Sequence, residues 1–385
     1  MLTPARPRLD SLDAFRGFTI AAMVLVNNPG DWNHLYPQLA HAKWHGWTFT
    51  DWIFPFFLFI AGVSMSLSLG RRADEGADKA ALLIQLFRRA AIIFLVGLSL
   101  NLIPAFDWSS VRIPGVLQRI ALCTALAAPI VVFFRWQWQC AWIVVFLSVY
   151  TALMLGVPVP DQNGVIHAGL LQPGADFGAY VDRWLLGGHL WPLSKTWDPE
   201  GLVSTLPALC SQLFGVLAGR WLMNHYSRAA QTVWMLLAGL VFLWLGAVLD
   251  AFLMPINKSL WTTSYCIFMT GWALIMFSVF YGFLDALKPA AIRAKVRILA
   301  TPLIIYGMNA LFIFAFSSLV AKMLGFIKIT RPDGTPVALK NLLAGALHVL
   351  QLSPTNASLL FALLFNAAMF LVAWAMWRKR WFVKV

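Results

Sequence analysis

The sequence predicts an all-α membrane protein, a polytopic bundle of about ten transmembrane helices. Hydrophobic residues make up 60% of the 385 residues and charged residues only 12%, a composition typical of multi-pass helical proteins. The apolar residues form runs long enough to cross about 30 Å of hydrocarbon, and basic residues cluster between the runs. The ten predicted spans are 13–29, 49–69, 88–105, 115–134, 138–157, 202–223, 231–253, 262–284, 299–324 and 357–377.

Two segments are predicted to lie outside these spans. The apolar piece 341–352 is too short to cross a bilayer, so we expect it to be re-entrant or to lie on the surface. The segment 158–201 is the longest connection, and long ordered loops tend to carry function. Because no shift in composition marks a second domain, residues 1–385 are predicted to form a single transmembrane domain.

The basic residues predict the orientation of the chain. If the N-terminus is cytoplasmic, about twice as many Lys and Arg residues lie on the cytoplasmic side as on the outer side. Both termini are therefore predicted to be cytoplasmic, with 30–48 and 158–201 outside. The cytoplasmic connector 71–89 mixes both signs of charge, and we leave open whether it is a solvated linker or binds an anionic ligand.

Charge and cysteine usage exclude several classes of partner. Membrane topology accounts for the net charge of +13, so no nucleic-acid partner is expected. The cysteines lie in apolar runs without paired spacing, so we expect neither a disulfide framework nor a metal site. They are Cys123, Cys140, Cys210 and Cys266.

The first span carries polar residues within an apolar run. Arg16 and Asn27 are 11 residues apart, or three helical turns, so they share one side of the helix about 16 Å apart. A deep arginine normally faces a protein interior or a wet cavity. We leave open a second interpretation, a structural pair of Arg16 with Asp13 at the membrane boundary.

The stretch HAKWHGWTFTDWIFPFFLFIAG, residues 41–62, places polar groups at the outer start of the second span. His41, Asp51 and Asn27 converge there, because the loop from 28 to 47 returns to the same membrane face. A neutral imidazole can take a proton from an attacking amine, and an amide can donate to an oxyanion. His41, Asn27 and Asp51 are therefore candidate catalytic residues, although spacing alone does not single out His41 among the histidines of the chain.

Seven stretches together resemble one family, the transmembrane acyltransferases typified by heparan-α-glucosaminide N-acetyltransferase and its bacterial inner-membrane relatives. They occur in the family's order and run from about residue 9 to the end. The stretches are LDAFRG, MVLVN, the 41–62 segment, RIPGVLQRIAL at 112–122, WDPEGLVSTLPA at 197–208, NKSLWTTSY at 257–265 and YGMNAL at 306–311.

The resemblance implies transfer of the acetyl group of cytosolic acetyl-CoA to the amine of a glucosamine-type sugar across the membrane. His41 and Asn27 look like the family's catalytic pair. We expect an inner-membrane protein that acts on a smaller bacterial amino sugar. The predicted contacts to acetyl-CoA are Arg16, Arg112, Arg119, Trp261 and Asn309; those to the sugar are Trp44, Asp198, Glu200, Asn257 and Lys258.

The chemistry leaves alternatives open. We favour direct transfer over an acetyl-histidine intermediate, because a bound amine beside a positioned base needs no further covalent step. A secondary transporter of a sugar or organic anion would also explain polar groups within spans, and a non-catalytic scaffold is a third class. No metal is required, and a homodimer is left open.

Overall fold

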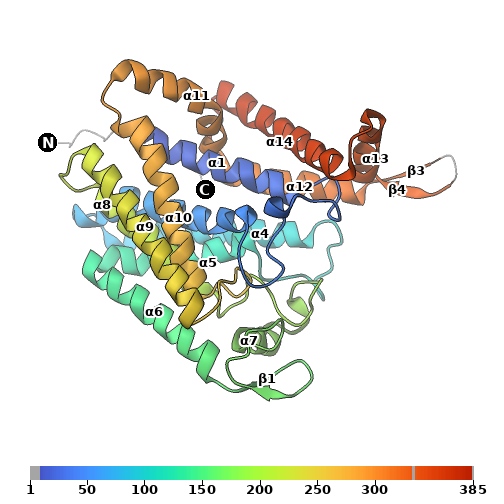
Figure 1. Ribbon diagram of the computed structural model, residues 1–385, viewed down its shortest axis with the longest axis horizontal. Coiled ribbons are helices and arrows are strands. Elements are labelled where there is room, and N and C mark those ends of the chain that lie inside the picture. The colour runs from blue at the N-terminus through green and yellow to red at the C-terminus, as the bar shows by residue number, and fades with distance from the viewer. Residues whose placement is uncertain (1–8, 332–333, 384–385) are drawn as a thin grey trace.

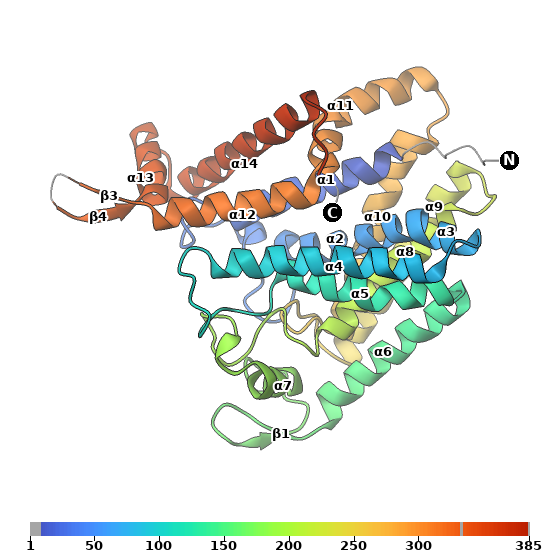
Figure 2. The same ribbon diagram turned by 180° about the vertical axis from the view of Figure 1, so that it is seen from behind.

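The computed structural model describes residues 9–331 and 334–383, which form a helical bundle with two short antiparallel hairpins (Figures 1 and 2). Within these residues, seven helical segments are long and apolar enough to cross a membrane. The prediction of an all-α polytopic membrane bundle is confirmed. The seven segments are Phe49–Asp74 (α2, Ile53–Met65, with its flanking turns and α3, Arg71–Asp74), α4 (Lys79–Leu102), α5 (Val116–Phe133), α6 (Trp136–Gly156), α9 (Arg228–Phe252), Thr263–Ala286 (α10, Thr263–Tyr281, and one further turn) and α14 (Pro354–Arg378).

Two further predicted spans, α1 (Asp10–Asn27) and α8 (Thr205–Leu222), are 18-residue helices that fall outside this apolar set. Both are largely buried and pack against neighbours through glycines. A Cβ at Gly17 of α1 would lie 1.7 Å from the Leu303 oxygen, and one at Gly215 of α8 would lie 2.0 Å from the Phe59 oxygen. Backbone-to-backbone packing of this kind is common between membrane helices.

The predicted span 299–324 is wrong as a single helix. The structure breaks it into α11 (Ala290–Met308) and α12 (Ala310–Phe326), which meet at 71°. Asn309 at the break donates to the Trp381 carbonyl at 3.0 Å and accepts from the Val383 amide at 3.0 Å. The apolar pattern continues through the break, which is why the run reads as one span.

Both ends of the described chain lie at the same end of the bundle. Val383 binds Asn309, and Gly307 packs so closely on α1 that a Cβ there would lie 1.9 Å from the Asp13 oxygen. We call this end, where α4 and α9 begin at Lys79 and Arg228, the basic end. The arrangement agrees with the prediction that the two termini share one side of the membrane.

The opposite end, here called the loop end, gathers the connections 28–48, 157–204 and 253–262. Trp44 donates to the Leu171 carbonyl at 2.9 Å, and Gly46 donates to the Ile256 carbonyl at 2.8 Å. The predicted loop 158–201 contains a helix and a hairpin. The elements at or near this end are β1 (Val159–Pro160), β2 (Ile166–His167), α7 (Phe177–Leu186), β3 (Lys328–Thr330), β4 (Pro336–Ala338) and α13 (Leu339–Ala346), which covers half of the predicted short segment 341–352.

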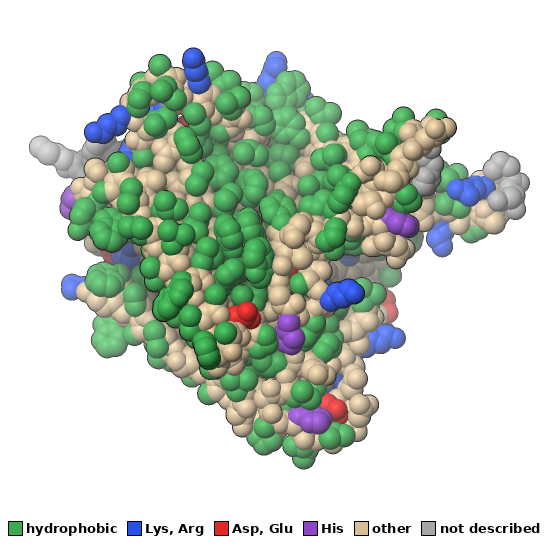
Figure 3. Space-filling model, viewed as in Figure 1, with side chains coloured by type: hydrophobic (Ala, Val, Ile, Leu, Met, Phe, Trp, Pro, Cys, Tyr) green, Lys and Arg blue, Asp and Glu red, His purple; other side chains and the backbone are tan. Residues whose placement is uncertain are grey.

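The position of each helix in the bundle follows from how much of it is covered. In the apolar 18-residue stretch of α9 only 17% of residues are buried, whereas 72% are buried in the corresponding stretch of Phe49–Asp74. Figure 3 shows apolar side chains over the middle of the face that carries α9 and α10, with Lys and Arg side chains toward its edges. Helix α9 therefore faces lipid, and α2 lies in the core.

Candidate active site

His41 and Asp51 form a hydrogen-bonded dyad at the loop end. The His41 Nδ1 atom lies 2.6 Å from Asp51 Oδ1. Asp51 is only 1% exposed, and its Oδ2 atom accepts from the Ala42 and Thr48 amides at 3.1 and 3.0 Å. An Asp51 carboxylate held in this way accepts the proton on Nδ1, which leaves Nε2 as the imidazole's acceptor.

Local structure explains why the carboxylate is so well fixed. Thr48 and Asp51 make a reciprocal capping box at the start of the helical segment Phe49–Asp74. The Asp51 carbonyl oxygen accepts from the hydroxyl of Tyr265 at 2.6 Å, and Tyr265 is itself fully buried. The aspartate therefore holds the imidazole on a rigid base, although His41 comes from a loop.

Lys258 lies over the face of the His41 ring. Its Nζ atom is 3.1 Å from Nε2 and 3.3 Å from Nδ1. An atom in line with the Nε2 lone pair would be much farther from Nδ1 than from Nε2, and one in the ring plane between them would collide with Cε1. The in-plane direction of the Nε2 lone pair is therefore not taken by Lys258.

This environment favours a neutral imidazole. Partial removal from water lowers the pKa of His41, and the positive charge of Lys258 lowers it further, against the opposing effect of Asp51. Partial burial also lowers the pKa of Lys258, while the negative charges of Glu200 and Asp51 favour its ammonium form. The pair therefore combines a neutral base with a nearby cation.

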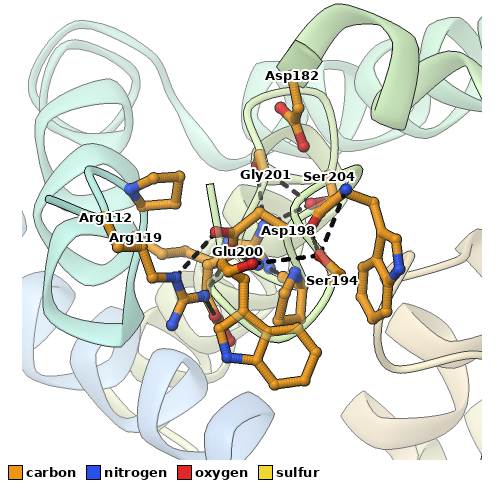
Figure 4. Close-up of polar contacts among 12 residues, drawn as sticks. Arg112, Arg119, Asp182, Ser194, Asp198, Glu200, Gly201 and Ser204 are labelled. Carbon is orange, nitrogen blue, oxygen red and sulfur yellow. Dashed lines mark hydrogen bonds and ion pairs between the residues drawn. The ribbon is translucent and has the colours of Figure 1, made fainter. Parts of the chain in front are cut away.

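Figure 4 shows an ion-pair cluster, and the charge of one of its members, Glu200, acts on His41 of the dyad. Arg112 donates from Nε and Nη2 to both oxygens of Asp198 at 2.8 and 2.5 Å, and from Nη2 to Glu200 at 2.5 Å. Burial works against the charge on Arg112, but these carboxylates outweigh it and raise the pKa of the guanidinium. Arg112 is therefore held as a cation by two carboxylates.

The remaining residues predicted to contact the sugar also lie at the loop end. Asn257 is fully buried; its Oδ1 accepts from the Leu260 amide at 2.9 Å, and its Nδ2 is 3.4 Å from His45 Nδ1. Trp44 packs edge-on against Trp197 at 5.1 Å. Asn257 thus shapes the turn that carries Lys258, and Trp44 joins two of the loops.

Asn27 does not join the dyad in this structure. Its side chain is exposed at the end of α1, and none of the described hydrogen bonds connects it to His41. The neighbouring Asn28 is buried instead, and its Nδ2 donates to the Val24 carbonyl at 2.7 Å. Of the three predicted catalytic residues, the structure brings only His41 and Asp51 into contact.

A large cavity of about 1110 Å³ opens toward the basic end. It lies among α1, α2, α4, α5 and α8, and residues at the α11–α12 break complete its wall. In the part of the chain that the structure describes, Asp13 is the only acidic residue in the lining. The basic residues that line it are Arg16, Arg71, Arg72, Arg89 and Arg228.

The two interpretations of Arg16 are both correct. Its Nη1 atom lies 3.1 Å from Asp13 Oδ1, and its Nη2 donates to the Ser64 hydroxyl at 2.7 Å, yet the side chain also lines the cavity. Asn309 lines the same cavity. These two of the five predicted contacts to acetyl-CoA therefore lie where a large anion could bind.

The other three predicted contacts to acetyl-CoA lie elsewhere. Arg112 belongs to the ion-pair cluster, and Arg119 is 1% exposed and donates to the Pro199 and Gly201 carbonyls at 3.0 and 2.9 Å. Trp261 is fully buried, with the Arg119 guanidinium 5.3 Å from its ring centre. None of the three is among the residues that line the cavity.

Sequence reasoning missed part of the cavity. Arg228 contributed only to the predicted orientation, and Gln212 was not singled out at all. Gln212 is fully buried, lines the cavity, and has no hydrogen-bond partner on either amide atom among the described residues. A glutamine in the middle of an apolar run was the signal that could have identified it.

Comparison with known proteins identifies the family of this chain. The family model described as heparan-alpha-glucosaminide N-acetyltransferase, catalytic, matches residues 8–248. The chain belongs to this family. It is 29% identical over 368 residues to the human protein named heparan-alpha-glucosaminide N-acetyltransferase. The alignment covers 81% of this chain and 53% of the human protein. The mouse protein of that name is 28% identical over 361 residues, 80% of this chain and 53% of its own. The chain thus spans about half the length of these two relatives.

The described part of this family member contains no cluster suited to a metal. Among the described residues, no group of three or more His, Cys, Asp or Glu side chains is arranged to hold an ion. The four cysteines are free, and three of them are buried. The polar groups that could carry chemistry are therefore the dyad, Lys258 and the ion-pair cluster.

Proposed function

We propose that this protein is an N-acetyltransferase that uses acetyl-CoA and acetylates the amine of a glucosamine-type sugar at the loop end. The observation that carries the proposal is the His41–Asp51 dyad, whose Nε2 lone pair remains open to an incoming amine. The names of the human and mouse relatives support an amino-sugar acceptor. The protein would then lie in a bacterial inner membrane, with its basic end facing the cytoplasm, where acetyl-CoA is made.

The cavity at the basic end suits the acyl donor. CoA carries a 3′-phosphate and a pyrophosphate, which prefer guanidinium donors, and the lining offers five arginines against one aspartate. Its volume of about 1110 Å³ is slightly above the usual range of about 300–1,000 Å³ for ligand pockets, which suits a ligand as large as CoA. We therefore assign the nucleotide to the basic cavity, with Arg16, Arg89 and Asn309 among its contacts.

A short chain of contacts leads from the cavity to the dyad. Gln212 lines the cavity, and the adjacent Ser211 accepts from the Trp261 indole at 3.1 Å. The Trp261 amide donates to the Lys258 carbonyl at 3.1 Å, and Lys258 contacts His41. The pantetheine arm would pass Trp261, which is how this residue would contact the donor.

At the dyad, His41 Nε2 would accept the proton of the amine as its nitrogen attacks the thioester carbon. Asp51 would hold the imidazole in the tautomer that leaves Nε2 free. Asp198 and Glu200 line the same region and would contact the sugar's hydroxyl groups, together with Trp44 and Asn257.

The test is acetylation of glucosamine by purified protein in detergent, with acetyl-CoA as donor. We expect N-acetylglucosamine and free CoA in equal amounts, and no exchange of labelled CoA into acetyl-CoA when sugar is absent. Exchange without sugar would replace direct transfer by an acetyl-histidine intermediate. Failure to acetylate any amino sugar would refute the proposed activity.

A further inference from the structure

Lys258 differs in its partners from the two arginines near it, Arg112 and Arg119. Arg112 is bound by two carboxylates, and Arg119 is bound by two carbonyl groups. In the described residues, by contrast, no carboxylate lies within hydrogen-bonding distance of Lys258 Nζ, whose polar contacts are to the two nitrogens of the His41 ring. A cation that is partly buried and faces a neutral base has charge available for a ligand.

The geometry shows where that charge would act. The acceptor amine must approach Nε2 in the plane of the ring, because the lone pair points there. The thioester carbon then lies one bond beyond the amine nitrogen, and its oxygen one bond beyond that carbon. Lys258 Nζ, 3.1 Å from Nε2 and over the ring face, can come within hydrogen-bonding reach of that oxygen.

We propose that the Lys258 ammonium stabilises the oxyanion formed when the acceptor amine attacks the thioester, an inference that rests on the function proposed above. As the C–N bond forms, the carbonyl π electrons move to oxygen, and Nε2 takes the amine proton. The oxyanion then collapses, the C–S bond breaks, and the thiolate takes the proton from Nε2. Lys258 gains and loses no proton, and Asn27 is not needed for this role.

The charges that face this pair come from several elements. His41 faces Asp51 of the second span, Lys258 of the 253–262 loop and Glu200 of the 157–204 loop. The positive charges of Arg119 and Arg112 also act on Lys258 and lower its pKa. Because Lys258 lowers the pKa of His41, its removal must raise that pKa and require a higher pH for the free base.

The experiment compares Lys258→Met, which removes the charge, with Lys258→Arg, which keeps it. We expect Lys258→Met to lower kcat by about 10²-fold or more, with both KM values little changed. The acid limb of kcat/KM should move up by roughly one pH unit. Lys258→Arg should keep the wild-type limb, and Lys43→Met, an exposed lysine of the His41 loop, should match wild type throughout.

Each outcome decides between the possibilities. An equal loss in Lys258→Met and Lys258→Arg with an unmoved acid limb would make Lys258 a structural residue and overturn the inference, as would a Lys258→Met variant with wild-type kcat. Lys258→Gln replaces Lys258→Met if the latter fails to fold. A wild-type protein that acetylates no sugar refutes the proposed function itself, which is a separate result.

Discussion

The two polar regions of this protein treat charge in opposite ways. At the loop end, Arg112, Asp198 and Glu200 neutralise one another, and Asp51 is held by amides and by His41. In the basic cavity, five arginines face a single aspartate among the described lining residues. The first region is organised before any ligand arrives. The second has an excess of positive charge in its lining, which favours an anionic ligand.

The largest expected effect tests whether the His41–Asp51 dyad is the reaction centre. We expect His41→Ala to lower kcat by about 10³-fold or more, because the acceptor amine loses its base. His45→Ala is the matched control, since His45 lies four residues on and contacts Asn257 rather than Asp51. The measurement is kcat for both variants, together with thermal unfolding. Equal losses would mean that the loop needs both imidazoles for its structure.

A smaller expected effect tests whether acetyl-CoA binds in the basic cavity rather than at the loop end. Arg89→Met should raise KM for acetyl-CoA about tenfold and leave KM for the sugar unchanged, because one charge-assisted hydrogen bond to phosphate is lost. Arg88→Met is the control, since Arg88 adjoins Arg89 on α4 but does not line the cavity. If both variants bind acetyl-CoA as wild type does, the nucleotide lies elsewhere.

The smallest effect concerns stability at the loop end. Burial raises the pKa of Asp182 to about 7, so the folded protein holds a proton there that the unfolded chain releases near pH 4. The folded state therefore binds more protons between these pH values, and stability must fall as pH rises through this window. We expect the apparent Tm to drop by roughly 2–4 °C between pH 5 and pH 8 from this group.

Asp182→Asn should remove that part of the pH dependence. Asp161→Asn is the comparison, because the pKa of Asp161 is lowered and its charge is constant over the same range. Thermal unfolding at several pH values measures both. A slope that Asp182→Asn leaves intact would assign the pH dependence to another group, such as Asp176, whose pKa burial raises to about 6.

The sequence predicted the local features of the site better than the distant ones. His41 and Asp51 lie ten residues apart in one polar stretch, and they do form a pair. The structure does not bring Asn27 into contact with this pair, because a helix turns by about 100° per residue and the end of α1 buries Asn28 while it exposes Asn27. Pattern alone does not fix that rotation.

The basic cavity could not be read from the sequence for a different reason. Its wall comes from at least six helices. Part of that wall is formed at the 71° break at Asn309, which lies within an apolar run. Arg71 and Arg89 belong to the connector 71–89, whose role the sequence left undecided. Arg228 served only to predict the orientation of the chain in the membrane. Only their convergence on one cavity distinguishes them from ordinary surface charges.

The contacts between α1 and α11 limit which amino-acid substitutions the protein can tolerate. At Gly17 and Gly307, an added Cβ would lie within 2 Å of a backbone oxygen of the other helix. Every missense change in a glycine codon adds at least that carbon, and neither backbone can retreat as a side chain could. We expect these two codons to accept no amino-acid replacement, although neither residue touches the dyad. Mutational screens that score only polar residues would overlook them.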